Sequence, residues 1–520
     1  MKNLFIDRRH IQRLDRVDIR FHHPCKDPGP VLAPEKPWEG DRLHLWSAPV
    51  WCAERSRWRL WYIGGDELLP LYAESKDGLH WERPCLGRIE WESSRNNNIV
   101  NLGFPAKTPK ERRLVLLRDD DDVDAARRFK ALTRVSGRLI GLVSADGLDW
   151  TLLPGAAVPS NDEYRLGYDA LHRRFVATAK GSPVPEFGRA VSLSTSPDFV
   201  EWTPAELVFW ADEIDQQQGR QRLEEILGNP DHRQPLRNQP ELYHTDVYNM
   251  PVFTYEGIYL GLPVIFHQSG LYWYAHPDDA PPALRSNQDG ILYPTLTSST
   301  DLRTWERCER APFIDLSPLS DDANYDHGAI HACPPVISGD ELWFYYYGAR
   351  FTHLKKSVVD EAGMRSSPDE PMGALYRARL RLDGFASLAA GPEPGVALTR
   401  PVRVDGPRLT VNADASGGEL RAEIRDAHTG RIIPGYGMGD FLGDPCLYSD
   451  DGLSKRMRFG TGARFDDDTL TNDSLAFTGN STAAALRWRD REHVAELQGR
   501  MVRVCFYLRE ADLYAFWFGA

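Results

Sequence analysis

The sequence predicts an all-β protein: a five-bladed β-propeller followed by a C-terminal β-sandwich. Three observations predict this fold class. A turn motif with Ser, Asp and Trp at fixed offsets recurs along the chain, runs of strand character precede each copy, and after Gly391 the motif ceases while short alternating runs continue. The expected domains are an N-terminal arm over residues 1–40, the propeller over 41–395 and the sandwich over 400–520.

The turn motif occurs four times in well-kept form. It reads SKDGLHW from Ser75, SADGLDW from Ser144, SPDFVEW from Ser196 and STDLRTW from Ser299, and a degenerate copy, RLDGFAS, begins at Arg381. Asp-Gly between apolar residues is a hairpin signal, and the Trp four residues after the Asp can pack across that hairpin. Each copy is therefore expected to join the two outer strands of one blade.

Two strand-like runs precede each copy, so that each unit reads as a four-stranded blade. In order they are LHLWSAPVW and RWRLWYIGG, LVLLR and RRFKALTRV, YRLGY and RRFVATAKG, DVYNMPVFTY and GIYLGLPVIF, and AIHACPPVI and DELWFYYYGAR. A polar insert at 212–239 is expected to hold one short helix. The alternative fold is two stacked sandwiches that share a turn.

The end segments complete the expected fold. The C-terminal runs ELRAEIRD, MVRVCFYLRE and ADLYAFWF alternate apolar and polar residues, which is typical of a sandwich. The arm carries a strand-like LFID and a Pro-rich stretch, PGPVLAPEKPW, that would lie over the outside of the propeller.

Composition excludes several classes of protein. With 42% hydrophobic, 11% aromatic and 26% charged residues, the chain is not disordered. Its net charge of −13 gives no drive toward nucleic acid or an anionic membrane. The start has no apolar signal segment, and the seven scattered cysteines form no CxxC pair. We expect a cytoplasmic protein with reduced thiols and no nucleic-acid or membrane partner; its oligomeric state stays open.

These features resemble the five-bladed β-propeller glycosidase group, which includes invertases and levansucrases, arabinanases and xylosidases, and mannoside phosphorylases. Arg118-Asp119 looks like the Arg-Asp of the invertase-type Arg-Asp-Pro motif, with Asp120 in place of the Pro. The segments PWEGDRLHLWSAPVW and NNNIV look like bacterial proteins labelled family-32-like glycosyl hydrolases. The resemblance implies a sugar-cleaving enzyme in which Asp119 holds sugar hydroxyls beside the reacting carbon.

One position departs from the pattern of that group. In the arabinanase-like families an Asp-Pro on the first blade's inner strand supplies the base or nucleophile, whereas this chain has Ala48-Pro49. Three interpretations stay open. Another blade supplies the carboxylate, Asp41 at the start of the strand supplies it, or the chain does not cleave glycosidic bonds.

Candidate catalytic residues come from the ends of inner strands, because these strands line a propeller's channel and gather at one mouth. Glycoside hydrolysis needs a carboxylic acid and a carboxylate. We expect the catalytic residues to be among Asp162 (with its neighbour Glu163), Asp246 and Asp326, and we expect substrate binding by Asp41, Trp46, Arg118, Asp119, Tyr248, His331 and His353.

Asp246 is the leading candidate for the general acid. It lies in an apolar and aromatic strand, which should raise its pKa. Asp326 or Asp162 would complete the pair. Asp119, beside the cation of Arg118, would stay ionised and bind substrate hydroxyls.

Aromatic and histidine side chains supply the other expected contacts. Trp46, Tyr248 and Tyr255 can stack on the C–H faces of a sugar, and His331 and His353 can steer a hydroxyl or bind a metal. We expect no cofactor and assign no metal site. The acidic run RDDDDVD suggests a structural calcium, but it lacks the Gly and terminal Glu of a calcium loop.

The expected function is hydrolysis of a glycosidic bond in an oligosaccharide or at a glycan terminus, with a carbohydrate as the partner. Retention or inversion stays open. One alternative is a glycoside phosphorylase, for which Arg118, Arg165, Arg350 and Lys355 would supply cations for phosphate. The other is a non-catalytic glycan-binding propeller, which Ala48 favours.

Overall fold

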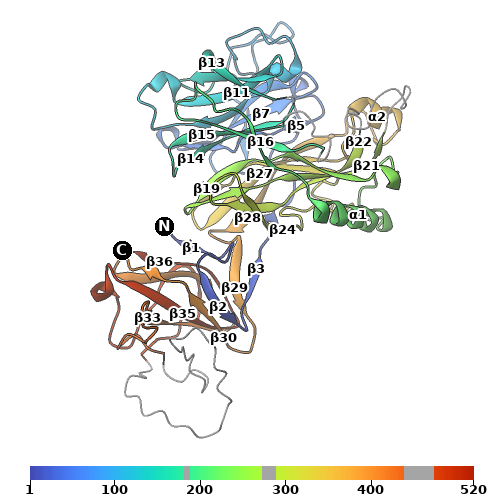
Figure 1. Ribbon diagram of the computed structural model, residues 1–520. Helices are drawn as coiled ribbons and strands as arrows, with labels where there is room; N and C mark the ends of the chain where they lie inside the picture. The colour runs from blue at the N-terminus through green and yellow to red at the C-terminus, as the bar shows by residue number, and fades with distance from the viewer. Residues whose placement is uncertain (161, 181–187, 272–287, 439–472, 520) are drawn as a thin grey trace. The chain divides into compact units, whose positions relative to one another are not determined.

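The computed structural model describes residues 1–160, 162–180, 188–271, 288–438 and 473–519 (Figure 1). The protein is all-β, with many sheets and few helices. In these ranges no helix is long and apolar enough to cross a membrane. The helices are α1 (Glu213–Gly228) and α2 (Lys356–Glu361), and the 3-10 turns are η1 (Pro37–Glu39), η2 (Ala53–Arg55), η3 (Pro109–Arg112), η4 (Ala125–Arg127), η5 (Pro240–Leu242) and η8 (Ala495–Leu497).

Helix α1 confirms the helix expected in the polar insert at 212–239. Asp212 caps its first turn by accepting a hydrogen bond from the backbone N–H of Asp215, and Asp215 accepts one from the backbone N–H of Asp212 in return. This reciprocal arrangement satisfies two backbone donors that the helix itself leaves unpaired.

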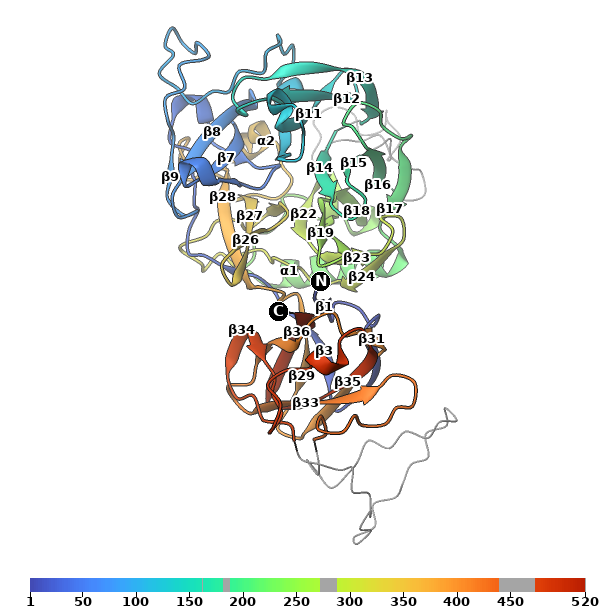
Figure 2. The same ribbon diagram turned by 90° about the vertical axis from the view of Figure 1, so that its left-hand side faces the viewer.

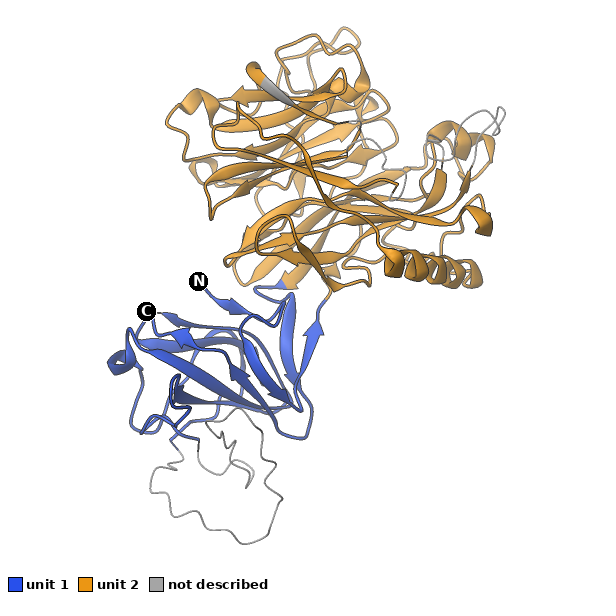
Figure 3. Ribbon diagram, viewed as in Figure 1, with its two compact units in different colours: residues 1–22, 381–520 blue, residues 23–380 orange. Residues whose placement is uncertain are grey.

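The chain folds into two compact units (Figure 3). Unit 1 comprises residues 1–22 and 381–520, and unit 2 comprises residues 23–380. Unit 2 is therefore inserted, along the sequence, between two segments of unit 1. The first 22 residues, expected to belong to a separate arm, form strands that pair with C-terminal strands of unit 1.

Unit 2 begins with three antiparallel sheets in which strands that follow one another in sequence pair (Figure 2). In the first sheet a short additional strand, β6, also pairs with β7. The strands are β5 (Leu43–His44), β6 (Val50–Cys52), β7 (Arg57–Gly64), β8 (Leu69–Ser75) and β9 (Trp81–Glu82) in the first sheet, β10 (Val115–Arg118), β11 (Phe129–Val135), β12 (Arg138–Ser144) and β13 (Thr151–Pro159) in the second, and β14 (Tyr164–Asp169), β15 (Arg174–Lys180), β16 (Val191–Ser196) and β17 (Glu206–Phe209) in the third.

The fourth repeat is divided between two sheets because prolines interrupt its strands. Pro251, Pro263 and Pro294 lie at or beside the breaks; proline cannot donate a backbone hydrogen bond, but their carbonyls accept bonds across the gaps. On one side of the breaks, β19, β20, β23 and β24 form a four-stranded sheet. On the other side, β18, β21 and β22 belong to a second, larger sheet. The strands are β18 (His244–Asn249), β19 (Val252–Tyr255), β20 (Ile258–Gly261), β21 (Val264–Leu271), β22 (Gln288–Pro294), β23 (Leu296–Ser299) and β24 (Trp305–Glu309).

The last repeat of unit 2 is completed by the N-terminal segment. Strand β4 (Cys25–Lys26) pairs with β28, with Lys26 opposite Ala378, and Asp27 binds the Arg377 guanidinium at 2.6 Å. Strand β22 joins β25 by a parallel pairing, so this sheet has eight strands. The remaining strands are β25 (Ala329–Ala332), β26 (Val336–Ser338), β27 (Glu341–Ala349) and β28 (Gly373–Arg381).

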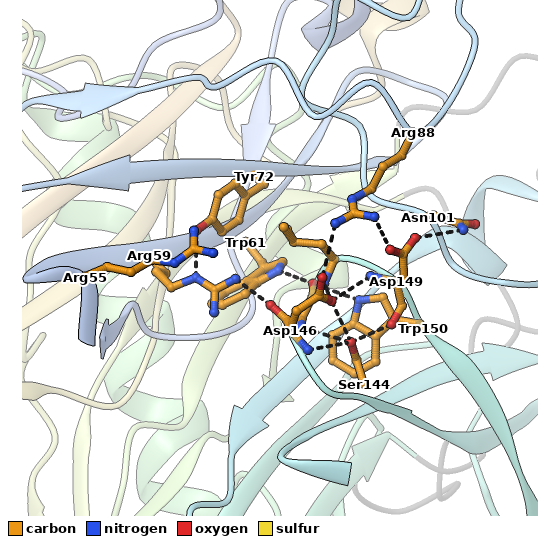
Figure 4. A network of polar contacts seen from close by, with 12 residues as sticks. Arg55, Arg59, Trp61, Tyr72, Arg88, Asn101, Ser144, Asp146, Asp149 and Trp150 are labelled. Carbon is orange, nitrogen blue, oxygen red and sulfur yellow. Dashed lines mark hydrogen bonds and ion pairs between the residues drawn. The ribbon is translucent and has the colours of Figure 1, made fainter. Parts of the chain in front are cut away.

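The four well-kept motif copies lie between the third and fourth strands of their repeats, which confirms the expected hairpins. The copy from Ser144 shows why the motif forms a turn (Figure 4). Ser144 Oγ accepts a bond from Gly147 N–H at 2.9 Å, Asp146 accepts bonds from the next backbone N–H groups, and Trp150 Nε1 donates to the Gly147 carbonyl at 3.0 Å. The motif therefore satisfies its own backbone.

The same turn also ties the second sheet to the first (Figure 4). Trp61 Nε1 of β7 donates to the Gly147 carbonyl at 2.6 Å, and Arg59 donates to the Asp146 carbonyl at 2.5 Å. Gly147 has φ 75°, and a Cβ there would lie 2.5 Å from the Trp61 ring. Glycine is required by both the left-handed backbone and the close approach of the neighbouring sheet.

Unit 1 consists of two antiparallel sheets with one shared hydrophobic core. Leu388 and Phe516 of one sheet and Ile424, Val504 and Phe506 of the other belong to that core and are almost fully buried. The first sheet contains β1 (Asn3–Leu4), β3 (Asp18–Phe21), β29 (Ala386–Ala390), β32 (Arg408–Asp414), β34 (Asn480–Ala485) and β36 (Ala511–Gly519); the second contains β2 (Ile11–Asp15), β30 (Gly395–Thr399), β31 (Val402–Arg403), β33 (Glu419–Asp426) and β35 (Met501–Arg509).

Candidate functional site

A cavity of about 180 Å³ in unit 2 collects side chains from the first strand of every repeat. His44 comes from β5, Arg113 precedes β10, Glu163 precedes β14, Tyr248 lies in β18 and His331 lies in β25. Five segments that are far apart in sequence therefore meet at one place. The other polar and aromatic residues of its wall are Arg42, Trp46, Tyr347, Phe351, Thr352 and His353.

Glu163 is the carboxyl group in the cavity wall. It accepts hydrogen bonds from Trp46 Nε1 at 2.8 Å, Arg113 Nη1 at 2.9 Å and Arg165 Nη1 at 3.4 Å. Burial raises its pKa, but the charges of Arg113, Arg165 and Lys180 together leave the pKa below its usual value. Glu163 is therefore a carboxylate at neutral pH.

Asp162 lies beside Glu163 and is surrounded by cations. Lys180 Nζ is 2.8 Å from Asp162 Oδ2, and Lys110 Nζ and Arg113 Nη1 are 3.3 and 3.4 Å from Oδ1. Burial opposes ionisation, but the charges of Lys180 and Arg113 hold the pKa of Asp162 well below its ordinary value. One guanidinium nitrogen of Arg113 thus binds both neighbouring carboxylates.

Three histidines in the cavity wall are uncharged. Burial lowers the pKa of His331 to about 3 and that of His353 to about 4, and it holds the pKa of His44 well below its ordinary value. His353 Nδ1 lies 2.8 Å from the Gln288 carbonyl, and Tyr248 Oη lies 3.1 Å from His353 Nε2. The carbonyl fixes the proton on Nδ1, so Nε2 accepts from the tyrosine.

Aromatic rings form the remaining walls of the cavity. His44 stacks on Trp46, with centroids 5.3 Å apart, and lies 4.4 Å from the Tyr347 ring. Tyr248 contacts His353 at 5.3 Å, and the Lys180 ammonium lies 4.0 Å from the Tyr248 centroid. Such rings offer flat apolar faces next to hydrogen-bonding groups.

Asp289 lies behind the cavity wall and differs from the carboxyls above. Burial raises its pKa, and its side chain is fully buried. Thr352 Oγ1, on the cavity wall, donates to Asp289 Oδ1 at 2.6 Å, and the backbone N–H groups of Arg237 and Gly290 donate to the carboxyl at 2.9 and 2.8 Å. Among the carboxyl groups of the described residues whose pKa departs from its ordinary value, Asp289 is the one whose pKa is raised.

Asp246 does not line this cavity, and its expected raised pKa is wrong. Burial does raise it, but a hydrogen bond from His244 and the charge of Arg189 lower the pKa of Asp246 below its usual value. Arg189 Nη1 and Gln268 Nε2 each lie 2.5 Å from Asp246 Oδ2, and His244 Nε2 lies 3.0 Å from Oδ1. The apolar strand brings the aspartate to cations from other segments, which its own sequence does not show.

Asp326 and Asp41 are held in ion pairs near the cavity rather than in its wall. Asp326 Oδ2 is bound by Lys26 at 2.6 Å and by Tyr346 Oη at 3.0 Å. Asp41 is bound by Lys356 at 2.9 Å and Arg365 at 3.0 Å. Burial opposes ionisation of Asp41, but the bond from Lys356 lowers its pKa.

Arg118 and Asp119 lie at the opposite end of β10 from the cavity residue Arg113. At about 3.3 Å per strand residue, roughly 16 Å separates them. The expected pairing of Arg118 with Asp119 is wrong, because Arg118 binds Asp120 at 2.6 Å while Asp119 binds Lys130 at 2.7 Å. The prediction combined residues that begin inner strands with residues that end one.

The cavity thus brings together Trp46, Tyr248, His331 and His353 of the expected residues, with Glu163 next to the expected Asp162. Sequence reasoning missed Arg42, His44, Arg113, Asp289 and Tyr347. A signal existed for the first three, since DRLHLW and KERRLVLL carry cations or histidine at the starts of inner strands.

The other residues singled out from the sequence lie in the hydrophobic core, in ion pairs or at a helix end. Ala48 packs against the core of the first sheet, and Tyr255 is buried in β19. Arg350 binds the Pro371 carbonyl and Glu370, and Lys355 caps α2. Six cysteines are free thiols, whereas Cys446 lies outside the described residues.

The described side chains include no group of three or more His, Cys, Asp or Glu residues placed to hold a metal ion. In the acidic run after Arg118, Lys130 binds both Asp119 and Asp122 at 2.7 Å. That ammonium occupies the place between the two carboxylates that a cation would share.

No protein-family model matches the sequence, and no curated protein matches it. Among solved structures, the chain is similar to an N-acetylgalactosamine deacetylase from F. plautii in complex with blood group B trisaccharide, with 14% identity over 70% of this chain and 96% of that one and a TM-score of 0.39.

Two further solved structures are similar to a comparable degree. One is the catalytic domain of a GH62 α-L-arabinofuranosidase from Coprinopsis cinerea, with 10% identity, coverage of 69% and 96%, and a TM-score of 0.40. The other comes from work on the GH130 family of mannoside phosphorylases, which contains glycoside hydrolases, with 12% identity, coverage of 69% and 94%, and a TM-score of 0.39. Values this low carry no conclusion about the activity of this chain.

Proposed function

We propose that this protein is a glycoside hydrolase that binds the terminal sugar of an oligosaccharide or glycan in the cavity of unit 2. The supporting observation is the wall itself, which combines the carboxylate of Glu163, the rings of Trp46, Tyr248 and Tyr347, and uncharged histidines. Sugars offer C–H faces to rings and hydroxyls to carboxylates and imidazoles.

We also propose that unit 2 is a five-bladed propeller whose channel opens at this cavity, and that unit 1 is a β-sandwich. Convergence of five first strands on one cavity supports the first statement. Two antiparallel sheets around one core support the second. The sequence resemblance to five-bladed glycosidases agrees with both.

In the proposed reaction Glu163 is the carboxylate that acts as base or nucleophile, and Arg113 keeps it ionised. Asp289 is the proton source and acts through Thr352. When Asp289 is protonated, its O–H donates to Thr352 Oγ1 across the 2.6 Å between the two oxygens, and the Thr352 hydroxyl hydrogen turns to the leaving oxygen. Asp289 then gives its proton to Oγ1 as Thr352 gives its own to the leaving oxygen, while the anomeric carbon bonds to Glu163 or to a water whose proton Glu163 takes. Burial raises the pKa of Asp289 above its ordinary value, which favours the protonated form that this role needs.

The test is release of reducing sugar from a glycoside panel by the parent and by Asp289→Asn. Asparagine keeps the shape and one of the two acceptor oxygens, the one that faces the Gly290 N–H, but has no transferable acid proton. On alkyl glycosides we expect a loss of about 10²–10⁴ in kcat, and on activated aryl glycosides a much smaller loss. Equal losses on both classes would remove Asp289 from the mechanism.

Glycan binding without catalysis is the second candidate, and one observation favours it: Asp162 and Glu163, the carboxyls nearest the cavity, are both held ionised by cations. Sugar binding with no turnover of any glycoside, with or without inorganic phosphate, would select it. Turnover only with phosphate would select a phosphorylase instead.

A further inference from the structure

Arg42 is a cation in the cavity wall that makes no hydrogen bond to a carboxylate among the described residues. Its Nε is buried and has no hydrogen-bond partner among the described residues. The nearest carboxylate oxygens are 3.6 Å away on Asp41 and 3.8 Å away on the exposed Asp66, and the hydrogen bond from Nη2 goes to the sulfur of Met372 at 3.2 Å. A thioether is a weak acceptor for a guanidinium.

Asp41 compensates Arg42 only in part, because two other cations share the same carboxylate. Lys356 Nζ and Arg365 Nη1 both bind Asp41 Oδ2, at 2.9 and 3.0 Å. Both distances are shorter than the 3.6 Å between Asp41 and Arg42. The buried Nε is closed to a group in the cavity, so the nitrogens that can serve such a group are Nη1, which makes no hydrogen bond to a described residue, and Nη2, whose acceptor is the Met372 sulfur.

The charges of the cavity wall sum to an excess of positive charge. Arg113 is compensated by Glu163 at 2.9 Å, and the three histidines are uncharged. Arg42 is the remaining charge among the residues that line the cavity. This local excess lies in a chain whose net charge is −13, so a general affinity for anions does not explain it.

Arg42 and Glu163 belong to different parts of the wall. Glu163 is bonded to Trp46, Trp46 stacks on His44, and His44 contacts Tyr347. Arg42 lies by the other end of this series, since its charge acts on both His44 and Tyr347, and it donates to the Met372 sulfur. A ring that lies along these aromatic groups with its anomeric carbon near Glu163 would direct another substituent toward Arg42.

We infer that the sugar bound in this cavity is a uronic acid whose carboxylate is held by Arg42. A planar guanidinium and a planar carboxylate form paired, charge-assisted hydrogen bonds, and the cavity offers no other uncompensated cation for the substrate. The inference rests on the proposed function, since it names the class of sugar that the same cavity takes.

The test measures binding of matched sugar pairs by calorimetry, using the full chain. The pairs are glucose with glucuronate, galactose with galacturonate, and mannose with mannuronate, which differ at C6 alone. We expect one uronate to bind at least about tenfold more tightly than its neutral partner. Arg42→Gln should abolish that difference by weakening uronate binding far more than binding of the neutral sugar, whereas Arg42→Lys should keep part of the difference. Arg303→Gln, at an exposed pair with Glu206, is the matched control and should behave as the parent does.

Binding of inorganic phosphate is measured separately, because phosphate, like a uronate, is an anion that a guanidinium can bind. Phosphate that binds through Arg42, without any preference for a uronate, would overturn the inference and mark a phosphate site. Equal affinity for both members of every pair would overturn it too, while leaving the proposed function intact. Binding of no sugar at all would overturn the proposed function together with the inference.

Discussion

Replacing Glu163 with glutamine should destabilise unit 2 by removing a buried negative charge. The Glu163 side chain is 5% exposed and compensates Arg113 and Arg165, whose side chains are 13% and 2% exposed. Breaking such a buried pair by changing one partner costs about 3–5 kcal/mol. For a unit of this size the melting temperature should fall by about 4–7 °C, given an unfolding entropy of roughly 2.1 cal/mol/K per residue.

The assay is thermal unfolding of the full chain for the parent, Glu163→Gln, Arg113→Met and the double variant. Because the two side chains are in direct contact, the double variant should be more stable than the sum of the single changes predicts, by about 0.5–3 kcal/mol. Arg303→Gln, at an exposed ion pair, is the control and should leave the transition unchanged. A melting temperature for Glu163→Gln equal to the parent's, or additivity within about 0.5 kcal/mol, would refute a buried and coupled ion pair.

Three further predictions concern the same unit. Burial lowers the pKa of His353 to about 4, so the folded state binds fewer protons than the unfolded state between about pH 4 and 6.5. The free energy of unfolding should therefore fall as the pH falls, by about 2 kcal/mol from pH 6.5 to pH 5. The variant His353→Gln should lose that part of the pH dependence of the melting temperature. Asp246→Asn should lower the melting temperature, because it breaks the bond to Arg189. It should leave unchanged the pH at which kcat falls on the alkaline side. A shift of that pH would restore Asp246 as the general acid. Trp46→Phe keeps a ring in the wall but removes the 2.8 Å bond to Glu163, so it should raise the pKa of Glu163 and weaken sugar binding about fivefold in calorimetry. An unchanged affinity would contradict the placement of the sugar against Trp46.

The hairpins of unit 2 were predictable because their information is local. Within Ser-x-Asp-Gly-x-x-Trp, the Ser and Asp side chains bond to backbone groups two or three residues away, so the sequence window contains the partners that shape the turn. The pairing of β4 with β28 was not predictable in this way, because its partners lie about 350 residues apart. The strand breaks at Pro251, Pro263 and Pro294 had a visible signal, since proline inside a strand favours an interruption.

The candidate site shows a similar limit for charged residues. Strand starts were a sound guide to position, and Trp46, Tyr248, His331 and His353 do meet at the cavity. The ionisation of a buried carboxyl was not accessible, because it depends on partners from other strands. Asp246 lies in an apolar segment, yet Arg189 is 57 residues away in sequence and holds it ionised.

The order of segments along the chain has a consequence for synthesis on the ribosome. Residues 23–27 emerge early, but their partner strand, β28, ends at Arg381, so the last sheet of unit 2 stays open until most of the chain has been made. Unit 1 can be completed only later, since β1 pairs with β36, the last strand in the sequence among the described residues. Contacts between such distant residues slow folding and leave sheet edges exposed in the nascent chain. A shortened chain that lacks the first 27 residues should therefore aggregate during expression, even though none of those residues lines the cavity.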